Sequence, residues 1–107
     1  MAATVAQEQF EQEVLKSTKP VLVDFSASWC APCRALAPVI DQLAVDVGDK
    51  AKVLKLDVDA APAIAERYGI QSIPCVVVFA KGAEVTRLVG VASKARLTNL
   101  LEVAGAR

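Results

Sequence analysis

Short apolar segments recur along the chain, and their spacing separates expected strands from expected helices. Two segments, 20–27 and 75–80, are apolar at nearly every position and rich in β-branched residues. This pattern is typical of strands that are covered on both faces of a sheet. Residues 51–58 form another strand, and a shorter strand at 84–89 completes a hairpin after the tight turn at 81–82.

The other regular segments have helical spacing, in which apolar side chains recur three or four positions apart. We predict helices at 6–17, 33–47 and 60–68, and a last helix that Ser93 caps. Phe10 and Val14 mark the buried face of the first helix. The last helix has one apolar stripe, made of Leu97, Leu100, Leu101 and Ala104.

Helices and strands therefore alternate along most of the chain, and a further short strand is expected near residues 3–5. Strands separated by helices pair in parallel through right-handed crossovers, whereas the closing hairpin adds antiparallel strands. We predict an α/β fold with a mixed sheet of about five strands and four helices that cover both faces. The length of 107 residues corresponds to one domain, residues 1–107.

The amino-acid composition argues against nucleic acids and membranes as binding partners. Lys plus Arg and Asp plus Glu number 12 each, so the net charge is zero, and no basic run indicates nucleic acid. Although 54% of the residues are apolar, no run approaches the ~18 residues needed to cross a membrane. The start of the chain lacks the basic and apolar regions of a secretory signal. We expect a cytoplasmic monomer that binds neither nucleic acid nor membranes.

Two of the three cysteines carry the candidate chemistry. Cys30 and Cys33 enclose Ala31 and Pro32 where a strand ends and a helix begins. The unpaired N–H groups and the positive dipole end of a helix N-terminus favour a thiolate, so we expect Cys30 to be the nucleophile. Cys33, one turn further, is the resolving thiol that attacks the mixed disulfide. Pro32 suits the first helical turn, where a missing N–H costs nothing.

The chain has no histidine. Cys–His and Ser–His dyads are therefore excluded. A metal half-site is the alternative interpretation of the cysteine pair, with Cys75 as a third ligand. A closed zinc site needs four ligands, so the redox interpretation is favoured and no metal is expected.

Asp24 interrupts the apolar run of the strand at 20–27. A lone carboxylate among Val23 and Phe25 is costly to ionise, which predicts a raised pKa. The alternative is an exposed aspartate on an edge strand, which the apolar neighbours disfavour.

Several segments together resemble the thioredoxin family. Residues 23–33, V-D-F-S-A-S-W-C-A-P-C, resemble the family's active-site segment, and 55–59, 68–70, 73–74 and 79–82 resemble further segments in the same order. The resemblance implies the thioredoxin fold and a protein-disulfide reductase that acts on disulfide-containing target proteins. It implies no bound cofactor beyond the redox-active Cys30–Cys33 disulfide, and recycling by a flavin-containing, NADPH-dependent thioredoxin reductase.

The resemblance also implies a target-binding surface. It predicts a cis bond between Ile73 and Pro74, beside the cysteine pair, with the backbone of Ile73 free to pair with an extended peptide. An ordinary trans proline before a strand is the alternative that the residues alone would favour. Trp29 is expected to cover the site rather than join the core. The expected surface comprises Trp29, Ala31, Pro32, Ile73, Pro74 and Gly90.

Two further roles follow from the resemblance. Asp24 is placed behind Cys33, where it could accept the proton of that thiol, directly or through water. Lys55 matches a family lysine near this acid and would tune it, although by itself it is typical of a solvated surface lysine.

Three positions depart from the commonest family pattern: Ser26, Ala31 and Cys75 stand where a bulky residue, glycine and threonine are frequent. Cys75 is either a third redox-active thiol or a small buried hydrophobic residue, and the second is favoured. Pro32 is kept, which favours a reductant. The alternatives to a general reductase are a thioredoxin-like protein with one narrow target, and a binding subunit that needs no turnover.

Overall fold

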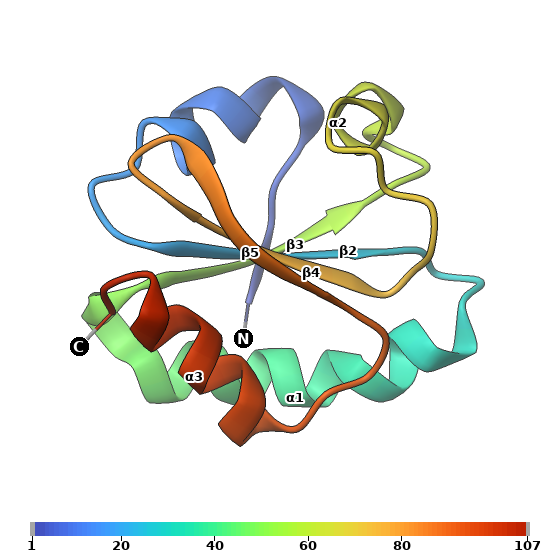
Figure 1. The fold of residues 1–107 in the computed structure, drawn as a ribbon. Coiled ribbons are helices and arrows are strands. Elements are labelled where there is room, and N and C mark those ends of the chain that lie inside the picture. Colours follow the sequence, from blue (N-terminus) through green and yellow to red (C-terminus); the bar gives the residue numbers. More distant parts are fainter. Residues whose placement is uncertain (1, 107) are drawn as a thin grey trace.

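The structure, a computed structural model, describes residues 2–106, and these contain one five-stranded mixed sheet (Figure 1). The strand order is β1-β3-β2-β4-β5. β1, β3 and β2 run parallel, whereas β4 runs antiparallel to both β2 and β5. The strands are β1 (Ala3–Thr4), β2 (Val21–Ser26), β3 (Lys52–Asp57), β4 (Cys75–Ala80) and β5 (Ala83–Val89). The predicted fold class is confirmed, including the short strand near the N-terminus.

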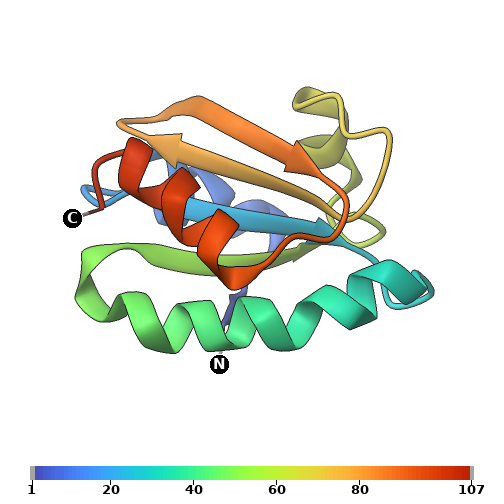
Figure 2. The ribbon, with the colours of Figure 1, turned by 60° about the horizontal axis from the view of Figure 1, so that its bottom comes forward.

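Helices cover both faces of the sheet (Figures 1 and 2). α1 (Ala31–Val47) and α3 (Lys94–Val103) pack on one face, while α2 (Pro62–Arg67) and the first helical segment pack on the other. In the described part of the chain, no helix is long and apolar enough to cross a membrane.

The continuous apolar runs of the central strands follow from this double coverage. In β2, Leu22 joins the cluster under α1 and α3, whereas Val23 and Phe25 join the cluster on the opposite face. Side chains of β4 alternate in the same way. Because successive side chains of a strand point to opposite faces, a strand covered on both sides has no position for an ordinary polar residue.

The predicted helix at 6–17 is wrong in type. The segment is a 3-10 turn, η1 (Gln7–Gln9), followed by a π-helical turn, η2 (Glu11–Leu15), in which the N–H of Lys16 donates to the carbonyl of Glu11. Phe10 and Val14 are both buried, as their spacing predicts. Packing of these two side chains outweighs regular helical hydrogen bonding in so short a segment.

β4 spans the predicted residues, 75–80, and the other boundaries differ from the predictions by at most a few residues. α1 begins at Ala31 rather than Cys33, since Cys30 is the N-cap and Pro32 lies in the first turn. Gly48 ends it with a φ of +52°, and a short 3-10 turn, η3 (Gly48–Lys50), follows. The two-residue turn between β4 and β5 has positive φ at both Lys81 and Gly82, which matches the right-handed twist of the hairpin.

Candidate active site

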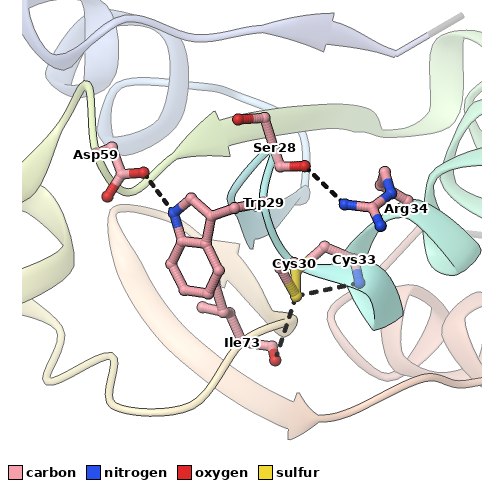
Figure 3. Close-up of a disulfide and its surroundings, with 7 residues drawn as sticks. All are labelled: Ser28, Trp29, Cys30, Cys33, Arg34, Asp59 and Ile73. Atoms are coloured by element: carbon pink, nitrogen blue, oxygen red, sulfur yellow. Dashed lines mark hydrogen bonds between the residues drawn. A yellow bond between two sulfur atoms is a disulfide. The ribbon is translucent and has the colours of Figure 1, made fainter.

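The cysteine pair lies where β2 passes into α1 (Figure 3). Cys30 and Cys33 form a disulfide with their Cα atoms 5.2 Å apart. The backbone N–H of Cys33 donates to Sγ of Cys30 at 3.2 Å. The sulfur of Cys30 therefore occupies the capping position of the helix N-terminus, where an otherwise unpaired N–H and the helix dipole stabilise negative charge.

The two sulfurs differ in their hydrogen bonding more than in their burial. Cys30 retains 6% and Cys33 3% of its accessible surface, and the two form a small cluster with Ala27, against which Val58 and Ile73 pack. Cys33 is the more buried of the two, and the difference is small. The asymmetry comes from the N–H of Cys33, which points at the sulfur of its partner and not at its own.

The segment before β4 lies against the disulfide. The Ile73–Pro74 bond is cis, as the family resemblance predicts, and Pro74 is buried. The carbonyl oxygen of Ile73 lies 3.8 Å from Sγ of Cys30 (Figure 3). The N–H of Gly90, directly after β5, donates to the carbonyl of Pro74 at 2.8 Å. The fold therefore brings Ile73, Pro74 and Gly90 together beside the cysteine pair.

Glycine at position 90 is required by backbone conformation rather than by space. Its φ is +99°, while a Cβ added there would meet no atom within 4 Å. Residues with a Cβ rarely adopt this φ. Gly90 is thus part of the turn that leads from β5 past Pro74 toward α3.

Trp29 is the large aromatic side chain of the site. It is 68% exposed, and its indole N–H donates to Oδ2 of Asp59 at 2.8 Å (Figure 3). The prediction that Trp29 lies outside the core is confirmed. Sequence reasoning assigned no role to Asp59, which lies in the turn after β3 and far from Trp29 in the chain.

The first turn of α1 is fixed to the loop before it. Nη1 of Arg34 donates to the carbonyl oxygen of Ser28 at 2.9 Å (Figure 3). Ala31 and Pro32, which form the turn between the two cysteines, are exposed. Arg34 is a second residue that sequence reasoning missed, because a surface arginine carries no local signal of a backbone contact.

Asp24 is buried in the middle of the central strand, with 1% of its surface exposed. Burial raises the pKa of this carboxyl to about 6, against a smaller lowering effect of Lys55. Among residues 2–106, its Oδ1 finds no hydrogen-bond partner. The predicted raised pKa is confirmed, and the alternative of an exposed edge aspartate is wrong.

Lys55 is the cross-strand neighbour of Asp24 in the parallel pair of β2 and β3. Its Nζ forms an ion pair with Oδ1 of Asp41 in α1, at 2.9 Å. That oxygen also accepts the N–H of Ala2 at 3.0 Å. Lys55 is therefore close to the buried acid, but its direct partner is Asp41, which sequence reasoning missed.

Cys75 is a free thiol at the start of β4, with 1% of its surface exposed. It belongs to the apolar cluster that contains Phe25 and Val77, and burial raises its pKa. This placement agrees with the favoured interpretation of a small buried hydrophobic residue. Among residues 2–106, no three His, Cys, Asp or Glu side chains gather as metal ligands would.

Comparison with known proteins identifies a family. A family model described as Thioredoxin matches residues 1–103. The chain is 47% identical to Thioredoxin 1 of Synechococcus elongatus over 102 residues, which cover 95% of each chain. It is 49% identical to Thioredoxin of Rickettsia bellii over 94 residues, which cover 88% of this chain and 90% of the relative. It is also 44% identical to the chloroplastic M-type thioredoxin of Chlamydomonas reinhardtii, over 94% of this chain and 72% of the relative.

Proposed function

Because the chain belongs to the thioredoxin family, we propose that it reduces disulfides of target proteins with Cys30 as the nucleophile and Cys33 as the resolving thiol. It is a thiol–disulfide oxidoreductase that works by dithiol–disulfide exchange. The observation that supports the assignment of roles is the 3.2 Å hydrogen bond from the N–H of Cys33 to Sγ of Cys30. This bond and the helix dipole stabilise a thiolate at Cys30, and the thiolate is the form that attacks disulfides.

The reaction begins with the reduced pair. The Cys30 thiolate attacks one sulfur of the target disulfide, the target S–S bond breaks, and one target thiolate leaves and is protonated by solvent. Cys33 then loses its proton and attacks Sγ of Cys30. The mixed disulfide breaks, the second target thiolate leaves, and the Cys30–Cys33 disulfide forms. Two electrons pass from the cysteine pair to the target.

Asp24 is the proposed acceptor of the Cys33 proton. Its pKa of about 6 lies near neutral pH, where a general acid–base group can both accept and release a proton. A buried carboxyl with an unpaired oxygen also has acceptor capacity to spare for a thiol or a bridging water. We assign Lys55 the role of tuning this acid through its positive charge.

The target-binding surface that we propose surrounds the sulfur of Cys30. Ile73 precedes β4, so an extended peptide could pair with its backbone as an added strand segment. The exposed indole of Trp29 supplies apolar contact area next to the nucleophile. The remaining members of the surface are Ala31, Pro32, Pro74 and Gly90.

The wider setting follows from the same chemistry. We propose that residues 1–107 act as one monomeric domain without a prosthetic group, and that an NADPH-dependent flavoprotein, thioredoxin reductase, returns the disulfide to the dithiol. A reducing compartment keeps such dithiols reduced, and the cytoplasm is the location that we propose.

An insulin reduction assay coupled to thioredoxin reductase and NADPH tests the proposal. The wild-type chain should reduce the insulin disulfides, so that the B chain precipitates, and the NADPH consumed should match the disulfides reduced. Cys30→Ser and Cys33→Ser should each abolish turnover. Cys75→Ser is the matched control, because it makes the same substitution outside the pair and should retain turnover. A folded wild-type chain that the reductase recycles but that leaves insulin intact would contradict a general reductase.

A further inference from the structure

The ion pair between Lys55 and Asp41 lies between the sheet and α1, next to the buried acid. Lys55 is the cross-strand neighbour of Asp24, so its stem starts beside that carboxyl. Its ammonium nevertheless pairs with Asp41 at 2.9 Å, and within the described residues no ion pair joins it to Asp24. The ammonium of Lys55 thus has two carboxylates nearby, Asp24 and Asp41, and it forms its ion pair with Asp41, the one nearer solvent.

Asp41 is well placed to hold that ammonium. It lies in the middle of α1, and its Oδ1 accepts both Nζ of Lys55 and the backbone N–H of Ala2. Both charged side chains are partly covered, at 22% exposed for Lys55 and 29% for Asp41. These contacts tie β3, α1 and the N-terminal segment together at one point.

Few titratable groups surround Asp24 on the elements packed around it. α3 contributes Leu97 and Leu101 to this face of the sheet, and its Lys94 pairs with Asp46. Two titratable groups bear on the carboxyl, Lys55 on β3 and Cys75 on β4, while Asp41 on α1 bears on Lys55. Lys55 is the cation of this set, so its position governs how strongly the charge of Asp24 is compensated.

We infer that Asp41 is a positioning residue of the redox reaction, which holds the ammonium of Lys55 in an ion pair of its own and so keeps the Asp24 carboxyl without a direct cationic partner. The inference rests on the proposed role of Asp24 as the acceptor of the Cys33 proton. A direct Asp24–Lys55 ion pair would stabilise the carboxylate and make it a weaker base near neutral pH. The Asp41–Lys55 ion pair prevents Lys55 from forming a direct ion pair with Asp24.

The test is Asp41→Asn in the oxidised protein, with the ¹³C NMR signal of the Asp24 carboxyl followed from pH 4 to 9. The asparagine oxygen still accepts the N–H of Ala2, so the change removes the ion pair and spares the backbone contact. Released from its partner, Lys55 should approach Asp24 and lower its pKa by about 1 pH unit, the lower end of the effect of a cation within about 4–6 Å. Asp41→Glu, which keeps the charge, should restore the wild-type titration.

Two comparisons make the result specific. Asp46→Asn is the matched control, because it makes the same substitution on the same helix and breaks a different ion pair, that with Lys94; it should leave the titration of Asp24 unchanged. In a Lys55→Met background, Asp41→Asn should also have no effect, since the cation through which it acts is gone.

Three outcomes would overturn the inference: an unchanged Asp24 titration in Asp41→Asn, an equal shift in Asp46→Asn, or a shift of the same size in the Lys55→Met background. The pH profile of mixed-disulfide resolution, measured by stopped flow on the reduced protein, separates this test from the proposed function. If Asp41→Asn lowers the pKa of Asp24 but the resolution profile does not follow, the control of the Asp24 charge by the ion pair stands, and the role of Asp24 as proton acceptor is refuted.

Discussion

Replacing Asp24 by asparagine should change how the stability of the protein depends on pH. The carboxyl is 1% exposed, and burial raises its pKa from 3.8 to about 6. Well below pH 3.8 the group is protonated in both the folded and the unfolded chain, so burial of the acid carries no charge penalty. Between pH 4 and 6 the unfolded chain ionises first, and stability of the wild type falls as pH rises. Above about pH 7 the folded state carries the whole penalty.

The size of this penalty follows from the two pKa values. They differ by about 2 pH units, and each unit corresponds to about 1.4 kcal/mol. The full penalty is therefore about 3 kcal/mol of unfolding free energy. Because the unfolded carboxyl is already partly ionised at pH 4, the wild type should lose about 2.5 kcal/mol between pH 4 and pH 8, and Asp24→Asn should not. A buried amide without partners costs about 1–3 kcal/mol at every pH. The variant should thus be less stable than the wild type at pH 4 and about equal or more stable at pH 8.

Guanidinium unfolding of the oxidised protein at half-unit steps from pH 4 to 8 measures this difference. The unfolding free energy of Asp24→Asn minus that of the wild type should rise with pH, with a midpoint between pH 4 and 6, and level off above pH 7. Asp49→Asn, an exposed position in the turn after α1, serves as the control and should give a flat difference curve. A flat curve for Asp24→Asn as well would refute the argument that burial keeps this acid costly to ionise.

Three shorter predictions concern the cysteines and the tryptophan. Cys33→Ser should trap mixed disulfides with target proteins through Cys30, Cys30→Ser should trap almost none, and iodoacetamide should label Cys30 faster than Cys33 in the reduced wild type; trapping through Cys33 in Cys30→Ser, with faster labelling of Cys33, would reverse the roles. Cys75→Ser should cost about 1–3 kcal/mol, because it places a hydroxyl in an apolar cluster, while turnover with insulin stays near wild type; a loss like that of Cys33→Ser would make Cys75 part of the mechanism. Asp59→Ala should free the indole of Trp29, the single tryptophan, and raise KM for protein disulfides more than it lowers kcat; unchanged fluorescence anisotropy would contradict this.

The sheet and its two helical layers could be predicted because their causes are local. A strand covered on both faces needs apolar side chains at successive positions, and β4 spans the same residues, 75–80, that the apolar run predicts. The first helical segment could not be predicted in the same way. Its apolar spacing is helical, yet its hydrogen bonding depends on how Phe10 packs against Tyr68 and Phe79, with ring centroids 5.6 and 5.7 Å apart.

In the candidate site, too, the features with local causes could be predicted from the sequence, and those that depend on tertiary contacts could not. The cysteine pair and the helix start are encoded within four residues, and Asp24 is conspicuous because a carboxylate interrupts an apolar strand. The partners that complete the site come from distant parts of the chain. Trp29 meets Asp59 across 30 positions, and that contact depends on β2 and β3 ending at the same edge of the sheet.

Asp41 illustrates what a helix sequence does offer. An exposed carboxylate on a helix usually finds a partner three or four positions away, as Asp46 does with Gln42 at 3.2 Å. The positions three and four away from Asp41 hold alanine, proline and valine, so no local partner exists. An acidic residue that is stranded in this way must be solvated or must bind a group from another element. Because Asp41 is half-buried on the inner side of α1, it binds a group from another element. That group is Lys55, the lysine that also lowers the pKa of Asp24.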